Sequence, residues 1–306
     1  MTALRRTGED YRDLADITPT VIYACPMSQD LLAPTPSPTD VPALSKQLHR
    51  DGIIGCKGAF SREWASRLHE DILREFEDAI SREGGAVGRG PRRYYVEMHP
   101  ENLRGLVDII EHPWIRAVSD AVLGPDWQVV EVGFDIPFAG AVNQPWHRDF
   151  RSAPVTYRDR RLTSLAFNMT AVDTTEDMGP FEVAPGTHYE DGLEFKHGMF
   201  PDPSTWSRYE EIAVRKMPQM GDISARSALT LHRGTANHSE LSRPVLVIGV
   251  DAPGASPEGL HDQTISREYA ASLAPQVRRH LQARVVDALE PIVQRHTIEG
   301  LVMGAP

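Results

Sequence analysis

The chain has 306 residues, a formal net charge of -11 and two cysteines, Cys25 and Cys56, so it is long enough to bury a substantial core. The acidic balance disfavours a nucleic-acid partner or an anionic membrane, and two cysteines exclude a disulfide scaffold. Because the sequence has neither a secretory signal nor an apolar run of the ~20 residues that span a bilayer, we expect a cytoplasmic protein.

The first 42 residues are predicted to be an extension of the protein. The end of this segment, APTPSPTDVP at 33–42, contains four prolines, which favour an extended arm over a core element. We expect residues 43–306 to form a single domain.

Helical periodicity begins after the arm. The stretch FSREWASRLHEDILREFEDAISREGG, at 60–85, has apolar residues at every fourth position and Ser61 as a plausible N-cap. A second helix is predicted from Pro113 to Val122. Further helices are predicted near the C-terminus, over about 264–298.

Between about 127 and 251 the sequence favours short strands. Five segments there are rich in β-branched and aromatic residues and are separated by Gly, Pro and Asp: WQVVEVGFDIPF, LTSLAFNMTAV, GPFEVAP, GDISARSALTLH and RPVLVIGV. Their number and spacing predict a sandwich or barrel of the jelly-roll kind, so the fold class is mainly β with flanking helices. The charged segment from Tyr189 to Gln219 is predicted to be a long loop over one end of this core.

A short motif in this region, QPWHRDF at 144–150, contains a histidine and an acid two residues apart. Four other His-x-acid pairs occur, so the spacing alone is weak: His69/Asp71, His99/Glu101, His188/Glu190 and His238/Glu240. On a strand, residues i and i+2 point to the same side, whereas on a helix they diverge. Since His147 and Asp149 follow a predicted strand, they are the pair best placed to bind one metal ion.

A second histidine from a distant strand would complete a facial set of two histidines and one carboxylate, the ligand set of non-haem Fe(II) oxygenases. His232, at the end of SALTLH, is the best match. Arg243 then opens the apolar strand RPVLVIGV, which would return beside the metal. Its guanidinium is suited to fork onto one carboxylate of a dicarboxylic co-substrate.

Four motifs in order resemble the phytanoyl-CoA dioxygenase (PhyH-like) family: HRD at 147–149, GPFEVAPGTH at 179–188, MGD at 220–222 and HRGTANHSELSRPVLVIG at 232–249. The match covers roughly residues 47 to 251, and the wording is closest to members that tailor natural products. The resemblance implies a double-stranded β-helix, a jelly-roll or cupin-like core. It also implies an oxygenase that uses Fe(II), O2 and 2-oxoglutarate, is stimulated by ascorbate, and acts on a small-molecule substrate.

The resemblance also assigns roles to individual residues. His147, Asp149 and His232 correspond to the iron ligands, and Arg243 to the anchor for the distal carboxylate of 2-oxoglutarate. Gln144 and Thr187 match positions that contact this co-substrate: Gln144 in natural-product-tailoring members, Thr187 in the PGTH turn. Related halogenases have Gly or Ala in place of the acid, so Asp149 argues for oxygenation over halogenation. A homodimer is an expectation at the family level.

Several alternatives remain open at this stage. A jelly-roll protein that binds without catalysis, or a zinc hydrolase using the same three ligands, fits the same pattern. The Arg/Tyr stretch at 89–95 either grips an anionic substrate or forms a solvated charge cluster. Asn168 either faces the site or satisfies a buried neighbour. Trp146 and Phe150 either wall the site or pack in the core.

Overall fold

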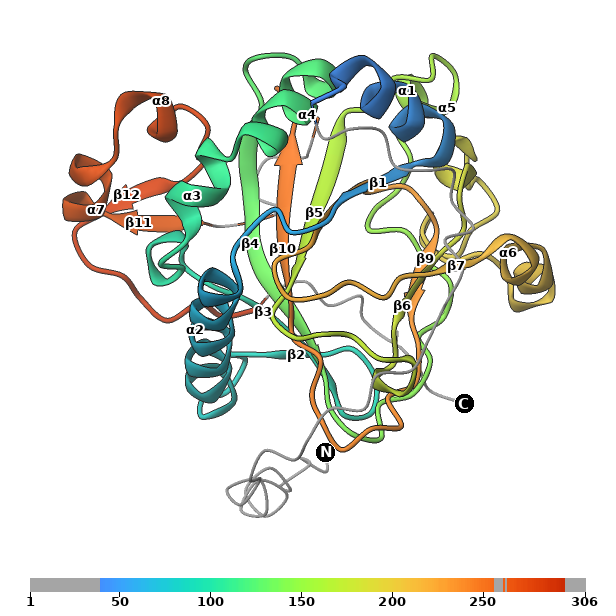
Figure 1. Ribbon diagram of the computed structural model, residues 1–306, viewed down its shortest axis with the longest axis horizontal. Helices are drawn as coiled ribbons and strands as arrows, with labels where there is room; N and C mark the ends of the chain where they lie inside the picture. Colours follow the sequence, from blue (N-terminus) through green and yellow to red (C-terminus); the bar gives the residue numbers. More distant parts are fainter. Residues whose placement is uncertain (1–38, 256–260, 262, 295–306) are drawn as a thin grey trace. The chain divides into compact units, whose positions relative to one another are not determined.

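Helices flank a β core in the computed structural model, which describes residues 39–255, 261 and 263–294 (Figure 1). Most of the predicted arm lies outside these residues. The helices are α1 (Val41–Asp51), α2 (Arg62–Ile80), α3 (Leu106–Glu111), α4 (Pro113–Leu123), α5 (Pro154–Tyr157), α6 (Trp206–Ile212), α7 (Arg267–Ser272) and α8 (Pro275–Arg278). The strands are β1 (Ile53–Cys56), β2 (Val87–Gly88), β3 (Arg93–Glu97), β4 (Gln128–Pro137), β5 (Ser164–Thr170), β6 (Phe181–Val183), β7 (Val214–Arg215), β8 (Ile223–Ser227), β9 (His232–Gly234), β10 (Val245–Asp251), β11 (Thr264–Ser266) and β12 (Arg284–Val286).

Two antiparallel sheets make up the core. The large sheet has seven strands in the order β1-β8-β5-β10-β4-β3-β2, and the small sheet has the order β7-β6-β9. In Figure 1, β4, β10 and β5 run side by side, and β6, β7 and β9 form a separate group. The prediction of a mainly β fold with flanking helices is confirmed.

One face of the large sheet is apolar. Strand pairing places Val132, Ile248 and Phe167 in one row across β4, β10 and β5, and all three side chains are buried. The indole of Trp114, on α4, meets the ring of Phe167 edge-on, with centroids 6.1 Å apart. Burial of this face beneath the helices is the main source of stability that the sheet provides.

The opposite face of the same strands is polar, because successive side chains alternate between the two faces. One of its rows contains Glu131 on β4 and Arg226 on β8, and the next contains Asn168 on β5 and Ser224 on β8. The Nζ of Lys216, which follows β7, donates to Ser224 Oγ at 2.6 Å. The polar face of the large sheet therefore meets the small sheet, and we call it the inner face.

Several predicted elements are found where the sequence placed them. α2 covers the periodic stretch, and Ser61 caps it by accepting a hydrogen bond from the Trp64 backbone N–H at 3.1 Å. α4 begins at Pro113 as predicted. The five strand segments correspond to β4, β5, β6, β8 with β9, and β10.

The start of the folded region differs from the prediction in two ways. α1 begins at Val41, inside the predicted arm, because Asp40 caps the helix and accepts from the Ala43 N–H, and Pro42 is tolerated in a first turn. The β core also begins well before residue 127, since β1, β2 and β3 join the large sheet. These strands are short, and they gain their hydrogen bonds by pairing with β8 and β4.

The prediction of long C-terminal helices over about 264–298 is wrong for the described residues. The helices there are only α7 and α8, and β11 pairs in parallel with β12. Pro275 disfavours helical backbone in the residue before it, and Leu273 and Ala274 are extended. The β-branched residues Val285 and Val286 then pair as a strand; residues 295–298 lie outside the described part of the chain.

The segment from Tyr189 to Gln219 is also more ordered than a loop. It contains α6 and β7, and β7 pairs with β6 as the edge of the small sheet. Among the helices of the described residues, none is both long and apolar enough to cross a membrane.

Candidate functional site

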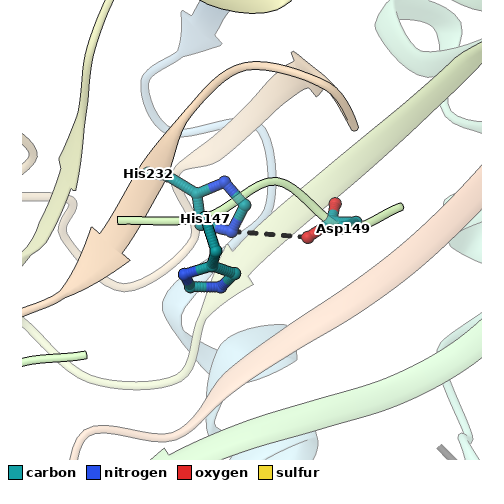
Figure 2. Close-up of side chains that lie close together, drawn as sticks. All are labelled: His147, Asp149 and His232. Atoms are coloured by element: carbon teal, nitrogen blue, oxygen red, sulfur yellow. Dashed lines mark ion pairs between the residues drawn. The ribbon is translucent and has the colours of Figure 1, made fainter. Parts of the chain in front are cut away.

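Backbone pairing brings the two predicted histidine ligands together. His147 donates its N–H to the carbonyl of His232 at 3.0 Å, and His232 returns a hydrogen bond at 2.8 Å. Asp149 is positioned next to them by a backbone hydrogen bond to Ala228 O at 3.0 Å. Figure 2 shows the three side chains converging from these two segments.

The donor atoms of these side chains lie close enough to share one ion. One ligand atom from each of His147, Asp149 and His232 lies within 4.8 Å of the others, and His232 Nε2 is 3.3 Å from Asp149 Oδ1. The dashed line in Figure 2 marks that contact. Two imidazoles and one carboxylate form a donor set that suits Fe(II), and it also suits Zn²⁺.

Both imidazoles are held in the tautomer that a metal ligand needs. His147 Nδ1 lies 2.8 Å from the carbonyl oxygen of Pro145, and His232 Nδ1 lies 2.9 Å from that of Thr230. A carbonyl oxygen only accepts hydrogen bonds, so each Nδ1 carries the proton and each Nε2 presents a lone pair. In both cases the acceptor is the carbonyl two residues earlier in the chain.

The electrostatic environment keeps these three side chains in the charge states that metal binding requires. Burial, followed by the neighbouring His232, holds the pKa of His147 well below its ordinary value. Burial and Arg226 lower the pKa of His232. Burial alone would raise the pKa of Asp149, but Arg226 and His232 outweigh it and hold that pKa well below its usual range. The site therefore presents two neutral imidazoles and an ionised carboxylate.

Arg226 is a functional residue that the sequence analysis missed. Its Nη1 lies 2.7 Å from Asp149 Oδ2 and its Nη2 lies 3.2 Å from Asp149 Oδ1, so the guanidinium forks onto the carboxylate. Arg226 is buried on β8, whereas the side chain of Asp149 is 32% exposed. One indication of this residue was present in the sequence: it is a charged residue within the otherwise uncharged strand segment ISARS, at a position that faces inward.

Arg243 lies two residues before β10, which begins at Val245 and not at Arg243 as predicted. Its Nε donates to the carbonyl oxygens of Met178 and Gly179, at 3.3 and 3.0 Å. Burial and the nearby Arg93 lower the pKa of Arg243 to about 10. Because backbone carbonyls hold the Nε edge of this charge, the two terminal nitrogens are the ones available to fork onto a carboxylate.

The other two predicted co-substrate contacts are engaged with the protein. Gln144 Oε1 accepts from the Gly234 N–H at 2.9 Å. Thr187 Oγ1 donates to Ala184 O at 2.7 Å and accepts from the Leu231 N–H at 2.9 Å. Both roles stay predictions, and for Thr187 the geometry counts against one because its only proton is already donated.

Burial bears on two of the open alternatives, for Arg93 and for Trp146. Arg93 is buried: its Nη1 pairs with Asp135 at 2.9 Å and its Nη2 donates to Thr235 O, so this part of the Arg/Tyr stretch is not a solvated cluster. Trp146 packs in a core cluster with Tyr209 and does not wall the metal site. Asn168 lies on the inner face.

A sequence model of the phytanoyl-CoA dioxygenase (PhyH) family matches residues 48–245. No curated protein matches the chain significantly. The family match includes α2, the whole small sheet, every strand of the large sheet except most of β10, and all three of the converging side chains.

Solved structures of similar fold include enzymes of natural-product biosynthesis. The epimerase SnoN, solved with Fe3+, alpha ketoglutarate and nogalamycin RO, has a TM-score of 0.57 and 17% identity, over 74% of this chain and 95% of its own. The carbocyclase SnoK of nogalamycin biosynthesis has a TM-score of 0.55 and 18% identity, over 68% of this chain and 83% of its own.

EctD from S. alaskensis, solved with 2-oxoglutarate and 5-hydroxyectoine, has a TM-score of 0.56 and 16% identity, over 71% of this chain and 77% of its own. At such low identities these similarities establish the fold alone. They confirm the predicted double-stranded β-helix core.

Proposed function

The chain belongs to the phytanoyl-CoA dioxygenase (PhyH) family of iron- and 2-oxoglutarate-dependent oxidoreductases, and we propose that His147, Asp149 and His232 hold its iron. The single observation that carries this proposal is the convergence of three donor atoms within 4.8 Å, with both Nδ1 atoms already bound to carbonyls. When bound, iron would activate O2, the oxidant, and 2-oxoglutarate would supply two of the four electrons that O2 accepts, leaving as succinate and CO2, while the substrate supplies the other two.

The protein's own residues orient these components. Arg226 holds the Asp149 carboxylate in place, which fixes the direction of the oxygen that faces the histidines. The terminal nitrogens of Arg243 would receive the distal carboxylate of 2-oxoglutarate. The acid at position 149 fills a ligand position that halogenases leave for chloride, so we assign oxygenation to this chain.

We further propose that the substrate is a small molecule, from secondary metabolism. Support comes from the similar enzymes SnoN and EctD, which were solved with nogalamycin RO and 5-hydroxyectoine. Hydroxylation, desaturation, cyclisation and epoxidation share the same three ligands, and the position of the substrate carbon selects among them.

The experiment combines metal analysis with a titration of 2-oxoglutarate. We expect one Fe(II) per chain, binding of 2-oxoglutarate to the metal-loaded protein, and substrate-stimulated succinate release in the presence of ascorbate. His147→Ala should abolish turnover, and Arg243→Ala should weaken 2-oxoglutarate binding by roughly 10- to 100-fold with little effect on folding. Zinc binding without any affinity for 2-oxoglutarate would identify a hydrolase instead, and unchanged succinate release by His147→Ala would refute the site.

A further inference from the structure

Lys216 carries a second positive charge into the space between the two sheets. Its backbone N–H donates to Phe181 O at 2.9 Å, which continues the pairing of β7 with β6. The alternation along these strands places Lys216 on the same face as Phe181 and His232. Its Nζ lies 4.9 Å from the centre of the Phe181 ring and donates to Ser224 Oγ at 2.6 Å. The ammonium therefore lies inside the site.

The charges around Lys216 are predominantly positive. Burial, then Arg226 and Arg243, lower the pKa of Lys216 to about 7. The nearby carboxylates are already used, since Asp149 pairs with Arg226 and Asp135 pairs with Arg93. Of the three N–H donors of the ammonium, the hydrogen bonds recorded among the described residues use one, to Ser224. An anion bound here would gain from Lys216 and Arg243 together.

Polar atoms without partners also lie on the inner face. Asn168 is in register with Ser224, and its Oδ1 is buried without a hydrogen-bond partner. The Nε atoms of Arg93 and Arg226 are in the same condition. Rotating the Asn168 amide by half a turn would present its NH₂ group, which donates to a carboxylate. Buried polar groups are rarely left unpaired, so these atoms point to a polar ligand.

We propose that Lys216 is a second cationic contact for 2-oxoglutarate, acting with Arg243 on the same dianion. This inference rests on the proposed function, because it assigns a further residue to the co-substrate of that site. Arg243 offers a planar fork, whereas Lys216 offers a compact charge that approaches from the small sheet. With both in place, the site would favour a dicarboxylic 2-oxo acid over a monocarboxylic one.

The competing explanation is that Lys216 merely ties the two sheets together through Ser224. Two substitutions separate these roles. Lys216→Gln removes the charge and keeps a donor for Ser224 Oγ, whereas Ser224→Ala removes the tie and keeps the charge. Lys46→Met, on an exposed lysine of α1, serves as a control for the loss of a lysine elsewhere. Lys216→Arg tests whether a different cation restores binding.

The measurement is the dissociation constant for 2-oxoglutarate, taken by calorimetry on protein loaded with Mn²⁺ so that no turnover occurs. We expect Lys216→Gln to weaken binding about tenfold or more, as for a charged hydrogen bond, and Lys216→Arg to recover part of it. Ser224→Ala and Lys46→Met should stay within about twofold of the parent protein. Circular dichroism spectra and melting temperatures check that each variant is folded.

A second ligand identifies the carboxylate that Lys216 contacts. If 2-oxobutanoate, which lacks the distal carboxylate, binds Lys216→Gln and the parent protein equally, then Lys216 contacts the distal carboxylate. If the substitution weakens binding of 2-oxobutanoate by the same factor as binding of 2-oxoglutarate, Lys216 contacts the carboxylate beside the keto group. Both outcomes support the proposal.

Two results would overturn it: a folded Lys216→Gln protein whose 2-oxoglutarate affinity matches that of the parent, or a Ser224→Ala protein that loses just as much affinity. If Lys216→Gln does not fold, Lys216→Met and Lys216→Arg decide the question by the same comparison. A parent protein that binds no 2-oxoglutarate at all would instead refute the proposed function.

Discussion

The two faces of the large sheet are made by the same strands, yet one face is apolar and packs in the core, whereas the other is polar and lines the candidate site. On the outer face, the row of Val132, Ile248 and Phe167 is fully apolar and packs beneath helices. In the adjacent row of the same sheet, Glu131 on β4 and Arg226 on β8 point inward. The alternation of a strand thus separates stability from chemistry by a single step in the sequence.

The inner face can hold several charges because oppositely charged side chains pair on it. Arg226 forks onto Asp149, and Arg93 pairs with Asp135. A buried charge left alone costs free energy, so removing one partner of either pair should also lower stability. Substitutions on the outer face should therefore change stability alone, whereas those on the inner face should also change ligand binding.

The largest expected effect is on the outer face. Phe167→Ala removes a fully buried ring that meets Trp114, and it should lower the free energy of unfolding by about 3–5 kcal/mol. Urea or thermal unfolding measures the loss. In the protein that remains folded, the dissociation constant for 2-oxoglutarate should stay within about twofold of its original value. A large change in that constant, with stability unchanged, would show that the two faces are not separable.

A smaller effect is expected from Arg226 on the inner face. Arg226→Gln leaves the three proposed ligands in place but removes the fork on Asp149, so affinity for Fe(II) should fall roughly 10- to 100-fold. Competition with a chelator measures this affinity. Arg233→Gln is the matched control, since Arg233 pairs with Glu182 on the other side of the small sheet. Equal metal affinity in the two variants would mean that Arg226 is only structural.

The sequence was sufficient for the features that depend on local pattern. The periodicity of α2 and the five strand segments could be identified, and the i, i+2 spacing of His147 and Asp149 follows from strand geometry. The resemblance of the motifs then linked these residues to His232 and Arg243. Sequence reasoning failed where strand pairing decides the structure. The strands β1 to β3 are too short to predict from their own residues. Near the C-terminus, Pro275 and the pairing of β12 with β11 prevent the long helices that the periodicity predicted.

Residues that act through a distant partner were also out of reach. In the sequence Lys216 looks like an ordinary surface charge, and for Arg226 and Arg93 the local pattern does not indicate which partner they contact. Their roles appear only once strand register places them on the inner face, beside Asp149, Ser224 and Asp135. Without knowing that β8 pairs with β1 and β5, no spacing rule connects position 226 with position 149.

The smallest expected effect concerns the pH dependence of stability. It arises where a histidine contacts two glutamates on the inner face. His261 Nδ1 pairs with Glu97, and its Nε2 lies 3.9 Å from Glu131 Oε2. Burial alone would lower the pKa of His261, but Glu131 and Glu97 outweigh burial, with a contribution from Asp251, and raise it to about 9. The folded protein therefore binds this proton more tightly than the unfolded chain does.

The sign of the pH effect follows from that difference. Because the pKa of His261 is raised on folding, its contribution to stability is complete below the ordinary value of 6.5 and is lost as pH rises towards 9. We expect about 1–3 kcal/mol of the free energy of unfolding to disappear over this range. Urea unfolding at a series of pH values measures it, with His261→Asn as the test and His238→Asn, on an exposed histidine, as the control. His238→Asn should keep the decline and His261→Asn should lack it; parallel pH curves for the two variants would show that titration of His261 does not cause the decline.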